Sequence, residues 1–406
     1  MRVPPASILL IAFASAAGAQ GLRPISRADA IAAAASTGTR SRLALTDSAA
    51  ANALARVASA YPNPALAASY SKAIPQYHLS LDQPIEYPWL RSARSDAAEE
   101  FRRASTIRYL IEHTALEVEA DTAYTTALAA AAHARLSQRS AQDADSLLTL
   151  ARLRREAGDA SELEVELAAL GAGQAENASA TDSLASLGAV LDLQRFMGLP
   201  ADQLQITLTD SIASLPAAPG TPPTTGDSGV VTLAVAEAQA TAAGAERALA
   251  VESRSIFSTP SIMVGFDTHD PTGSEPGILP TFGITLPLPL WDWRGGQKAA
   301  AQAELTRAQA ELAFARRESD ARIAEARRQL EATRTRAMRD EKLLASARRV
   351  AAMSLTAYAE GAAPIATVLE AQRTARDAFG RWVDDLAAAQ NAAALLRLHT
   401  LTASVP

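Results

Sequence analysis

The sequence of 406 residues contains no cysteine. Neither a disulfide framework nor a metal site built on thiolates is therefore possible. Histidine is scarce as well: the five histidines are scattered, without the H-x₃-H spacing that brings zinc ligands together on a helix. His269 has Asp267 and Asp270 beside it, but Asp, His, Pro and Gly together are ordinary loop composition. We therefore expect no metal site.

The chain also lacks the motifs of common enzyme classes. It has no G-x-S-x-G elbow, no Walker loop and no G-x-G-x-x-G, so we expect neither an enzyme nor a bound cofactor. A net charge of −6 argues against a nucleic-acid partner. Only 5% of the residues are aromatic, whereas 48% are hydrophobic, with alanine prominent. This composition favours long helices that pack closely through small side chains.

The N-terminal residues 1–19 have the layout of a secretory signal peptide. Arg2 precedes a short apolar run, and Ala17-Gly18-Ala19 is a small-x-small cleavage site. We expect the mature chain to begin near Gln20; a retained apolar helix is the alternative. A lipid anchor would need a cysteine after the cleavage site and is excluded. No later stretch reaches about 18 apolar residues without a charge, so the exported protein is periplasmic, secreted, or held in an outer membrane by β-strands.

The remaining sequence divides into two similar halves. We predict a first repeat over 20–198, a Pro/Gly-rich linker over 199–229 and a second repeat over 230–406. Each repeat has a helix, an alternating hairpin, a very long helix, a glycine turn and a return helix. Three residues recur at an offset of 203 (287 − 84): Pro84 and Pro287, Arg91 and Arg294, and Gly158 and Gly361.

Two segments, at about 64–85 and 260–290, alternate with period two and are predicted to form strand hairpins. The return strand of the second segment has one apolar face and one small or polar face, which is typical of a membrane strand between lipid and water. Its apolar face holds Phe282, Ile284, Leu286, Leu288 and Leu290, and its other face holds Thr281, Gly283, Thr285, Pro287 and Pro289. In the strand before it, Ile262, Val264 and Phe266 alternate with Met263, Gly265 and Asp267.

The longest predicted helices run from Arg91 to Ala157 and from Arg294 to about Glu360. The second is free of proline, and its ~63 residues would span roughly 95 Å at 1.5 Å per residue. Its apolar residues recur in alternating steps of four and three, as in a coiled coil. A shorter helix from Ser26 to Ala60 has Asp29 three residues after Ser26, a plausible N-terminal cap.

Aromatic residues gather at the end of each hairpin where strands meet helices. Rings at one level favour an interfacial girdle; the alternative is a hydrophobic plug between helix and hairpin. The residues are Tyr61, Tyr87, Trp89, Phe257, Trp291 and Trp293.

Four strands per chain are too few to close a barrel, since the smallest have about eight. Open strand edges are not tolerated in a bilayer, so the barrel must be shared between copies of the chain. The strand number alone allows two, three or more copies.

The ordered double set of elements resembles the outer-membrane efflux (TolC) family over essentially the whole mature chain. The segments that carry the resemblance are YPNPAL and FSTPSI before the strands, LPLPLWDWRGGQKAAAQAEL after the last strand, and EAGDASELEV and AEGAAPIATVLEAQ at the turns. It implies a mainly α fold with a small β part, closed as a homotrimer with a twelve-stranded β-barrel and an α-helical barrel. The implied location is the outer membrane, with a long periplasmic helical extension and contacts to lipid.

The resemblance also implies a passive duct of a tripartite efflux or type I secretion system. Its partners would be a periplasmic adaptor (membrane-fusion) protein and an inner-membrane transporter of the RND, ABC or MFS type. In the family the glycine turns meet the adaptor; the alternative is that the glycines only cap helices. The matching residues are Ala157, Gly158, Asp159, Glu360, Gly361 and Ala362.

Family members often carry acidic residues six and nine positions after the second glycine, forming a ring that constricts the tunnel. Here these positions are Thr367 and Glu370, so a ring would depend on Glu370 alone. A solvated glutamate is the alternative.

The competing function is a periplasmic coiled-coil scaffold without a membrane barrel. An adaptor protein is a poorer fit, because it would need a lipoyl-like β domain around one helical hairpin. For a duct, metal ions, drugs or solvents, and polypeptides all remain possible cargo.

Overall fold

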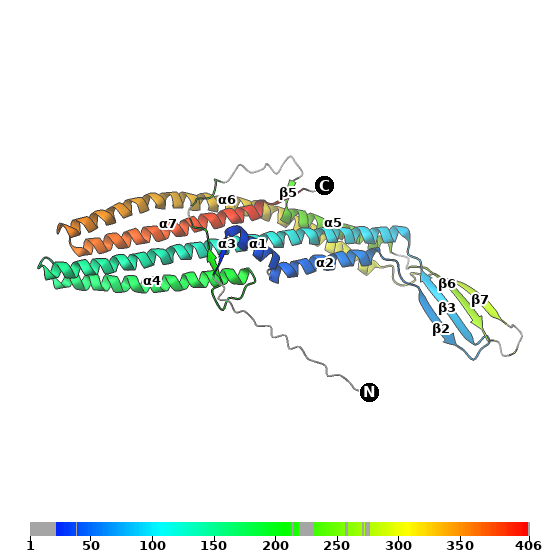
Figure 1. Ribbon diagram of the computed structural model, residues 1–406. Coiled ribbons are helices and arrows are strands. Elements are labelled where there is room, and N and C mark those ends of the chain that lie inside the picture. The colour runs from blue at the N-terminus through cyan, green and yellow to red at the C-terminus, as the bar shows by residue number, and fades with distance from the viewer. Residues whose placement is uncertain are drawn as a thin grey trace, which may run out of the picture. The chain divides into compact units, whose positions relative to one another are not determined.

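The computed structural model describes residues 22–37, 39–212, 214–218, 230–255, 259–269, 272 and 277–404. The predicted signal peptide, much of the predicted linker and Phe257 lie outside these ranges. Most described residues are helical (Figure 1). The helices are α1 (Arg27–Thr37), α2 (Thr39–Ser59), α3 (Pro88–Glu156), α4 (Glu162–Phe196), α5 (Leu233–Arg254), α6 (Gly295–Ala359) and α7 (Ile365–Thr400). The strands are β1 (Arg23–Ile25), β2 (Ala65–Tyr70), β3 (Tyr77–Pro84), β4 (Ile206–Leu208), β5 (Val230–Thr232), β6 (Ser261–Thr268), β7 (Ile278–Thr285) and β8 (Thr402–Ser404).

The chain forms two compact units. Unit 1 comprises residues 1–33, 123–213 and 343–384, and unit 2 comprises residues 34–122, 214–342 and 385–406. Each unit draws on both halves of the sequence, and the predicted boundary at 199–229 does not separate them. The small parallel pair β1–β4 belongs to unit 1, and the small antiparallel pair β5–β8 belongs to unit 2.

The main sheet lies in unit 2 and has the strand order β2-β3-β6-β7, with every neighbouring pair antiparallel (Figure 1). The two predicted hairpins therefore lie side by side: β3, the second strand of the first hairpin, pairs with β6, the first strand of the second hairpin. At this seam Leu81 lies opposite Val264 and Ser80 lies opposite Gly265. Strands β2 and β7 are the outer strands of the sheet as the described chain forms it.

The register places most of the large apolar residues of the four strands on one face; Met263 and Leu279 lie on the other. Leu66, Leu81, Val264 and Phe282 form one continuous row across the sheet, because residues directly opposite one another share a face. The next row, on the other face, is Ala67, Ser80, Gly265 and Thr281. The predicted two-faced strands are confirmed.

The apolar face is open within the described chain. Phe282 is 76% exposed and Ile284 is 79% exposed, values that a side chain packed in a core would not have. On the opposite face, Gly265 and Gly283 leave no room for a larger residue. A Cβ on Gly265 would lie 3.0 Å from the Leu79 carbonyl oxygen, and one on Gly283 would lie 2.9 Å from Met263 Cε.

The prediction that the last strand continues to Leu290 is wrong. Strand β7 ends at Thr285, opposite Ser261, the first residue of β6. Beyond this point β7 has no partner, and Pro287 and Pro289 cannot donate to a ladder. Leu286, Leu288 and Leu290 remain exposed but lie outside the sheet.

The ends of the long helices agree closely with the sequence prediction, but the single helix predicted from Ser26 to Ala60 is divided into α1 and α2. Helix α3 begins at Pro88, three residues before the expected start, because proline suits the first helical position. Helix α6 covers Gly295–Ala359, within a residue of the expected span. At the start of α1, the Ser26 backbone N–H donates to Asp29 Oδ2 over 3.1 Å, and the Asp29 N–H donates to Ser26 Oγ over 3.3 Å. This reciprocal cap holds the pKa of Asp29 below its usual value through its hydrogen bonds to Ser26.

A hydrophobic cluster in unit 1, which we call the tip cluster, joins α3, α4, α6 and α7 near the two glycine turns. Val368 and Tyr358 in it are fully buried. Each fully buried aliphatic side chain contributes about 1.5–3 kcal/mol, so the tip cluster holds the four helices together. Its members are Leu147, Leu148, Ala151, Val165, Ala168, Tyr358, Ile365 and Val368.

Candidate functional site

The first glycine turn, between α3 and α4, ends its helix with a left-handed residue. Gly158 has φ +87°. The Asp159 N–H donates to the Arg154 carbonyl over 2.8 Å, and the Gly158 N–H donates to the Arg155 carbonyl over 2.9 Å. This is the Schellman arrangement, in which glycine is favoured because a Cβ is disfavoured at positive φ. Ser161 then caps α4 by accepting from the Glu164 N–H.

The second turn, between α6 and α7, repeats this backbone 203 residues later. Gly361 has φ +75°. The Ala362 N–H donates to the Ala357 carbonyl over 2.7 Å, and the Gly361 N–H donates to the Tyr358 carbonyl over 3.0 Å. The two turns are therefore the same structure at equivalent positions of the two predicted repeats.

One arginine connects the two turns. Arg154 Nη1 donates to the Tyr358 carbonyl over 2.7 Å, and its Nη2 donates to the Asp159 carbonyl over 3.2 Å. The guanidinium also lies over the Tyr358 ring, 4.6 Å from the ring centroid. A cation at helix C-termini is favourable because it compensates unpaired carbonyls. Sequence reasoning missed Arg154, whose only signal was a positive charge in the last turn of a long helix.

The predicted docking residues at both turns are exposed. A Cβ added at Gly158 would meet nothing within 4 Å, and one at Gly361 would meet only Arg154, at 3.5 Å. Backbone conformation, not crowding within the chain, therefore explains both glycines, and the space above them is free for another molecule. The exposed residues are Ala157, Gly158, Asp159, Glu360, Gly361 and Ala362.

The predicted gate residues both lie on α7 and are exposed. Thr367 is in the first turn, where its N–H donates to the Pro364 carbonyl over 3.1 Å. Glu370 lines a groove of about 810 Å³ in unit 1, with Arg348 and Arg373 also in its wall. The carboxylate therefore shares its surroundings with arginines, a setting that sequence reasoning did not anticipate.

The predicted aromatic girdle lies in unit 2, apart from Phe257, which is outside the described residues. Trp291 is 91% exposed, and Tyr61, Trp89 and Trp293 are also exposed. Tyr87 is half-buried and stacks on Trp89, with ring centroids 4.6 Å apart. A plug between helix and hairpin would bury these rings, so their exposure favours the girdle.

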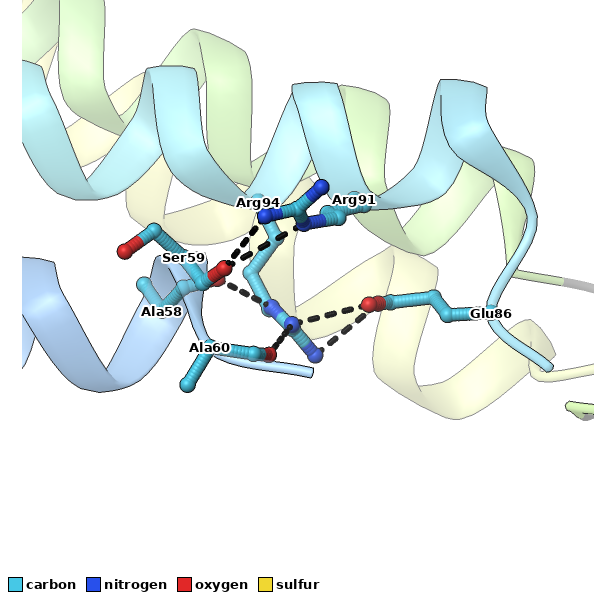
Figure 2. Close-up of polar contacts among 6 residues, drawn as sticks. All are labelled: Ala58, Ser59, Ala60, Glu86, Arg91 and Arg94. Carbon is cyan, nitrogen blue, oxygen red and sulfur yellow. Dashed lines mark hydrogen bonds and ion pairs between the residues drawn. The ribbon is translucent and has the colours of Figure 1, made fainter. Parts of the chain in front are cut away.

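Beside the girdle, arginines bind the C-terminal end of α2, as Figure 2 shows. Arg91 donates to the Ser59 carbonyl from Nη2 over 2.9 Å and from Nε over 3.2 Å. Arg94 donates to the Ala58 carbonyl over 2.7 Å and pairs with Glu86 at 2.9 Å. Glu86 is buried, so Arg94 supplies the charge that its carboxylate requires.

Arg294, which corresponds to Arg91 in the second repeat, makes equivalent contacts with the C-terminal end of α5. Its Nη1 donates to the Ser255 carbonyl over 3.3 Å and to Ser255 Oγ over 2.7 Å, and its Nη2 lies 3.0 Å from Glu252. The sequence showed that the two arginines correspond but not that each binds the end of the helix that leads into a hairpin.

Comparisons with known proteins identify the fold. No protein-family model matches the chain, and no curated protein matches it in sequence. Among solved structures, the outer membrane protein VceC from Vibrio cholerae matches with a TM-score of 0.76 at 16% identity, over 93% of this chain and 97% of VceC. The Campylobacter jejuni CmeC outer membrane channel matches with a TM-score of 0.77 at 13% identity, over 92% and 85%. The Neisseria gonorrhoeae MtrE outer membrane channel matches with a TM-score of 0.71 at 16% identity, over 92% and 89%.

The chain has the fold of these outer-membrane channels. The fold expected from the TolC resemblance, mainly helical with a small sheet, is thereby confirmed. All three matched proteins are described as outer-membrane proteins or channels, not as enzymes.

In the part of the chain that the structure describes, no helix is both long and apolar enough to cross a membrane. No three His, Asp or Glu side chains in that part are placed to hold a metal ion.

Proposed function

We propose that this chain is the protomer of a passive outer-membrane duct, the outer component of a tripartite efflux or type I secretion system. The observation that carries the proposal is the two-faced sheet in unit 2, whose apolar face is uncovered in the chain itself. An open apolar face of this size on a soluble monomer would promote aggregation, whereas in a bilayer it would be solvated by lipid. The fold match to outer-membrane channels supports the same conclusion.

The sheet is suited to closure by further copies of the chain. With four strands of alternating direction, β2 of one copy would run antiparallel to β7 of the next, so the ladder could continue around a ring. Three copies would give twelve strands, within the range of membrane barrels. Three is also the number that the TolC resemblance implies. Closure would remove both open edges, which a bilayer does not tolerate.

In this arrangement the face containing Phe282 and Ile284 lies against lipid, and the face containing Thr281, Gly283 and Thr285 lines a water-filled lumen. The exposed tryptophans would lie at the membrane boundary, where indole rings are favoured. The long helices would continue as the wall of a periplasmic tunnel. Selection of cargo would rest with an inner-membrane transporter of the RND, ABC or MFS type.

We further propose that the two glycine turns are where a periplasmic adaptor docks. Support comes from the exposure of the predicted docking residues, the matching backbone of the two turns at equivalent repeat positions, and the free space above both glycines. Glu370 is also proposed as a gate of the tunnel, with Arg348 and Arg373 in the wall of the same groove.

The proposal is tested by fractionation of cells that express the full-length gene. We expect the mature protein in the outer membrane as a trimer that resists washing with carbonate or urea and persists in detergent. A periplasmic scaffold would wash off the membrane, and a soluble monomer would overturn the proposed function.

A further inference from the structure

The two turns share one backbone but present different chemistry. We define tip 1 as residues 154–164 and tip 2 as residues 357–367, which correspond position by position at the 203-residue offset. Tip 2 has one charged side chain, Glu360. Tip 1 has six: Arg154, Arg155, Glu156, Asp159, Glu162 and Glu164.

Some of the charged side chains of tip 1 are engaged in hydrogen bonds or ion pairs within the chain, and others are exposed to solvent. Arg154 is engaged with the carbonyls of Tyr358 and Asp159, and Arg155 pairs with Glu162 at 3.0 Å on the surface. With two arginines and four carboxylates, tip 1 carries a net charge of −2, and Glu156 and Asp159 are exposed on its surface.

Tip 2 offers few polar side chains to a partner. Tyr358 and Ile365 are buried in the tip cluster, and Glu360 and Thr367 are the polar residues among those exposed: Ala359, Glu360, Gly361, Ala362, Pro364, Ala366 and Thr367. Small side chains allow another backbone to approach closely, and any larger side chain there would obstruct it.

We infer that the two tips recognise the adaptor by different means. This inference rests on the proposed function, in which the adaptor docks at both tips. Tip 1 selects the partner by charge and fits a helical-hairpin turn that carries lysine or arginine. Tip 2 binds an equivalent turn by close packing, with no charge requirement. Exposed charges at an interface rim govern association rate and partner choice and are screened by salt, whereas packing contacts of small residues are not. The single duct protomer would thus contain one selective contact and one general contact.

The test uses the purified trimer in detergent and the soluble part of a periplasmic adaptor from the same genome. Glu156→Lys/Asp159→Lys reverses the charge of tip 1, and Glu156→Asp/Asp159→Glu keeps the charge but changes the shape. The matched changes at tip 2 are Ala359→Lys/Ala362→Lys and Ala359→Glu/Ala362→Glu, at the same repeat positions. All four variants alter exposed residues, so trimer yield serves as the folding control.

At 50 mM NaCl we expect the charge reversal at tip 1 to weaken adaptor binding about tenfold, and the charge-keeping variant to bind nearly normally. At 500 mM NaCl the difference between these two variants should largely vanish. Both tip 2 variants should weaken binding to a similar extent, whichever charge they introduce, and equally at both salt concentrations.

Normal binding by the charge-reversed tip 1, or opposite effects of lysine and glutamate at tip 2, would overturn the inference. Crosslinking from cysteines placed at Asp159 and Ala362 distinguishes failure of this inference from failure of the proposed docking site. If they crosslink to the adaptor, docking at the tips stands even when the charge rule fails. If neither crosslinks, the docking proposal itself is wrong.

Discussion

Two regions of this molecule place the same apolar residue types in opposite environments. In the four-stranded sheet of unit 2, leucine, isoleucine, valine and phenylalanine side chains are exposed, and Ile284 reaches 79%. In the tip cluster of unit 1 the same types are buried, and Val368 is fully inaccessible. The sheet residues recur every second position and the cluster residues every third or fourth. The comparison teaches that the apolar residues of the tip cluster find their partners within the chain, whereas the apolar face of the sheet has none there.

The largest effect should come from a charge placed in the tip cluster. Val368→Asp would bury a carboxylate with no partner, which costs about 3–5 kcal/mol. We expect low yield of folded protein and unfolding at markedly lower denaturant concentration, measured by circular dichroism of the extracted protein. The control is Thr367→Asp, an exposed neighbour that should change little. Equal loss for both variants would mean that the cluster is not a core.

A charged substitution on the apolar face of the sheet tests whether lipid covers that face. Phe282→Arg, near the middle of β7, should cost about 2–4 kcal/mol and reduce the amount of trimer in the outer membrane, although Phe282 is 76% exposed within the chain. Thr281→Arg, on the other face of the same strand, should assemble normally because that side would meet water. Trimer yield on semi-native gels is the measurement. If both variants assembled equally well, the apolar face would not lie in lipid.

The attachment of the sheet to the helices should depend on polar contacts, because the sheet has no core of its own. Arg94→Ala removes the partner of the buried Glu86 and two donors to the end of α2, and we expect a loss of about 1–3 kcal/mol. Adding Glu86→Gln to Arg94→Ala should recover part of that loss, since no buried charge is then left alone. Thermal unfolding of the trimer in detergent measures both. A double variant no better than the single one would show that the carbonyl contacts dominate.

The smallest effect on stability should come at the exposed end of the tip cluster. Gly361→Trp forces a side chain at positive φ, which costs about 1 kcal/mol, but it displaces no core residue. Trimers should therefore assemble normally, while export through the reconstituted pump and crosslinking to the adaptor should fail. Gly361→Asn is the control, because asparagine tolerates the left-handed conformation and is smaller. Normal export by Gly361→Trp would show that Gly361 only caps its helix and does not contact the adaptor.

Much of the fold follows from local patterns that the sequence carries. The two-faced strands, the cap of Ser26 and Asp29, the positive φ of Gly158 and Gly361, and the span of α6 could all be predicted. Each depends on period, propensity or a backbone angle, and these physical constraints act within a few residues.

What only the tertiary structure decided involves partners distant in the sequence. Strand β7 ends at Thr285 because β6, its neighbour in space, begins at Ser261. Arg154 serves both turns because the tip cluster brings α6 beside α3, and Arg91 and Arg294 acquire their role only once the ends of α2 and α5 are in place. These outcomes depend on which surfaces meet, and a local pattern contains no information about the distant residue that will complete its hydrogen bonds.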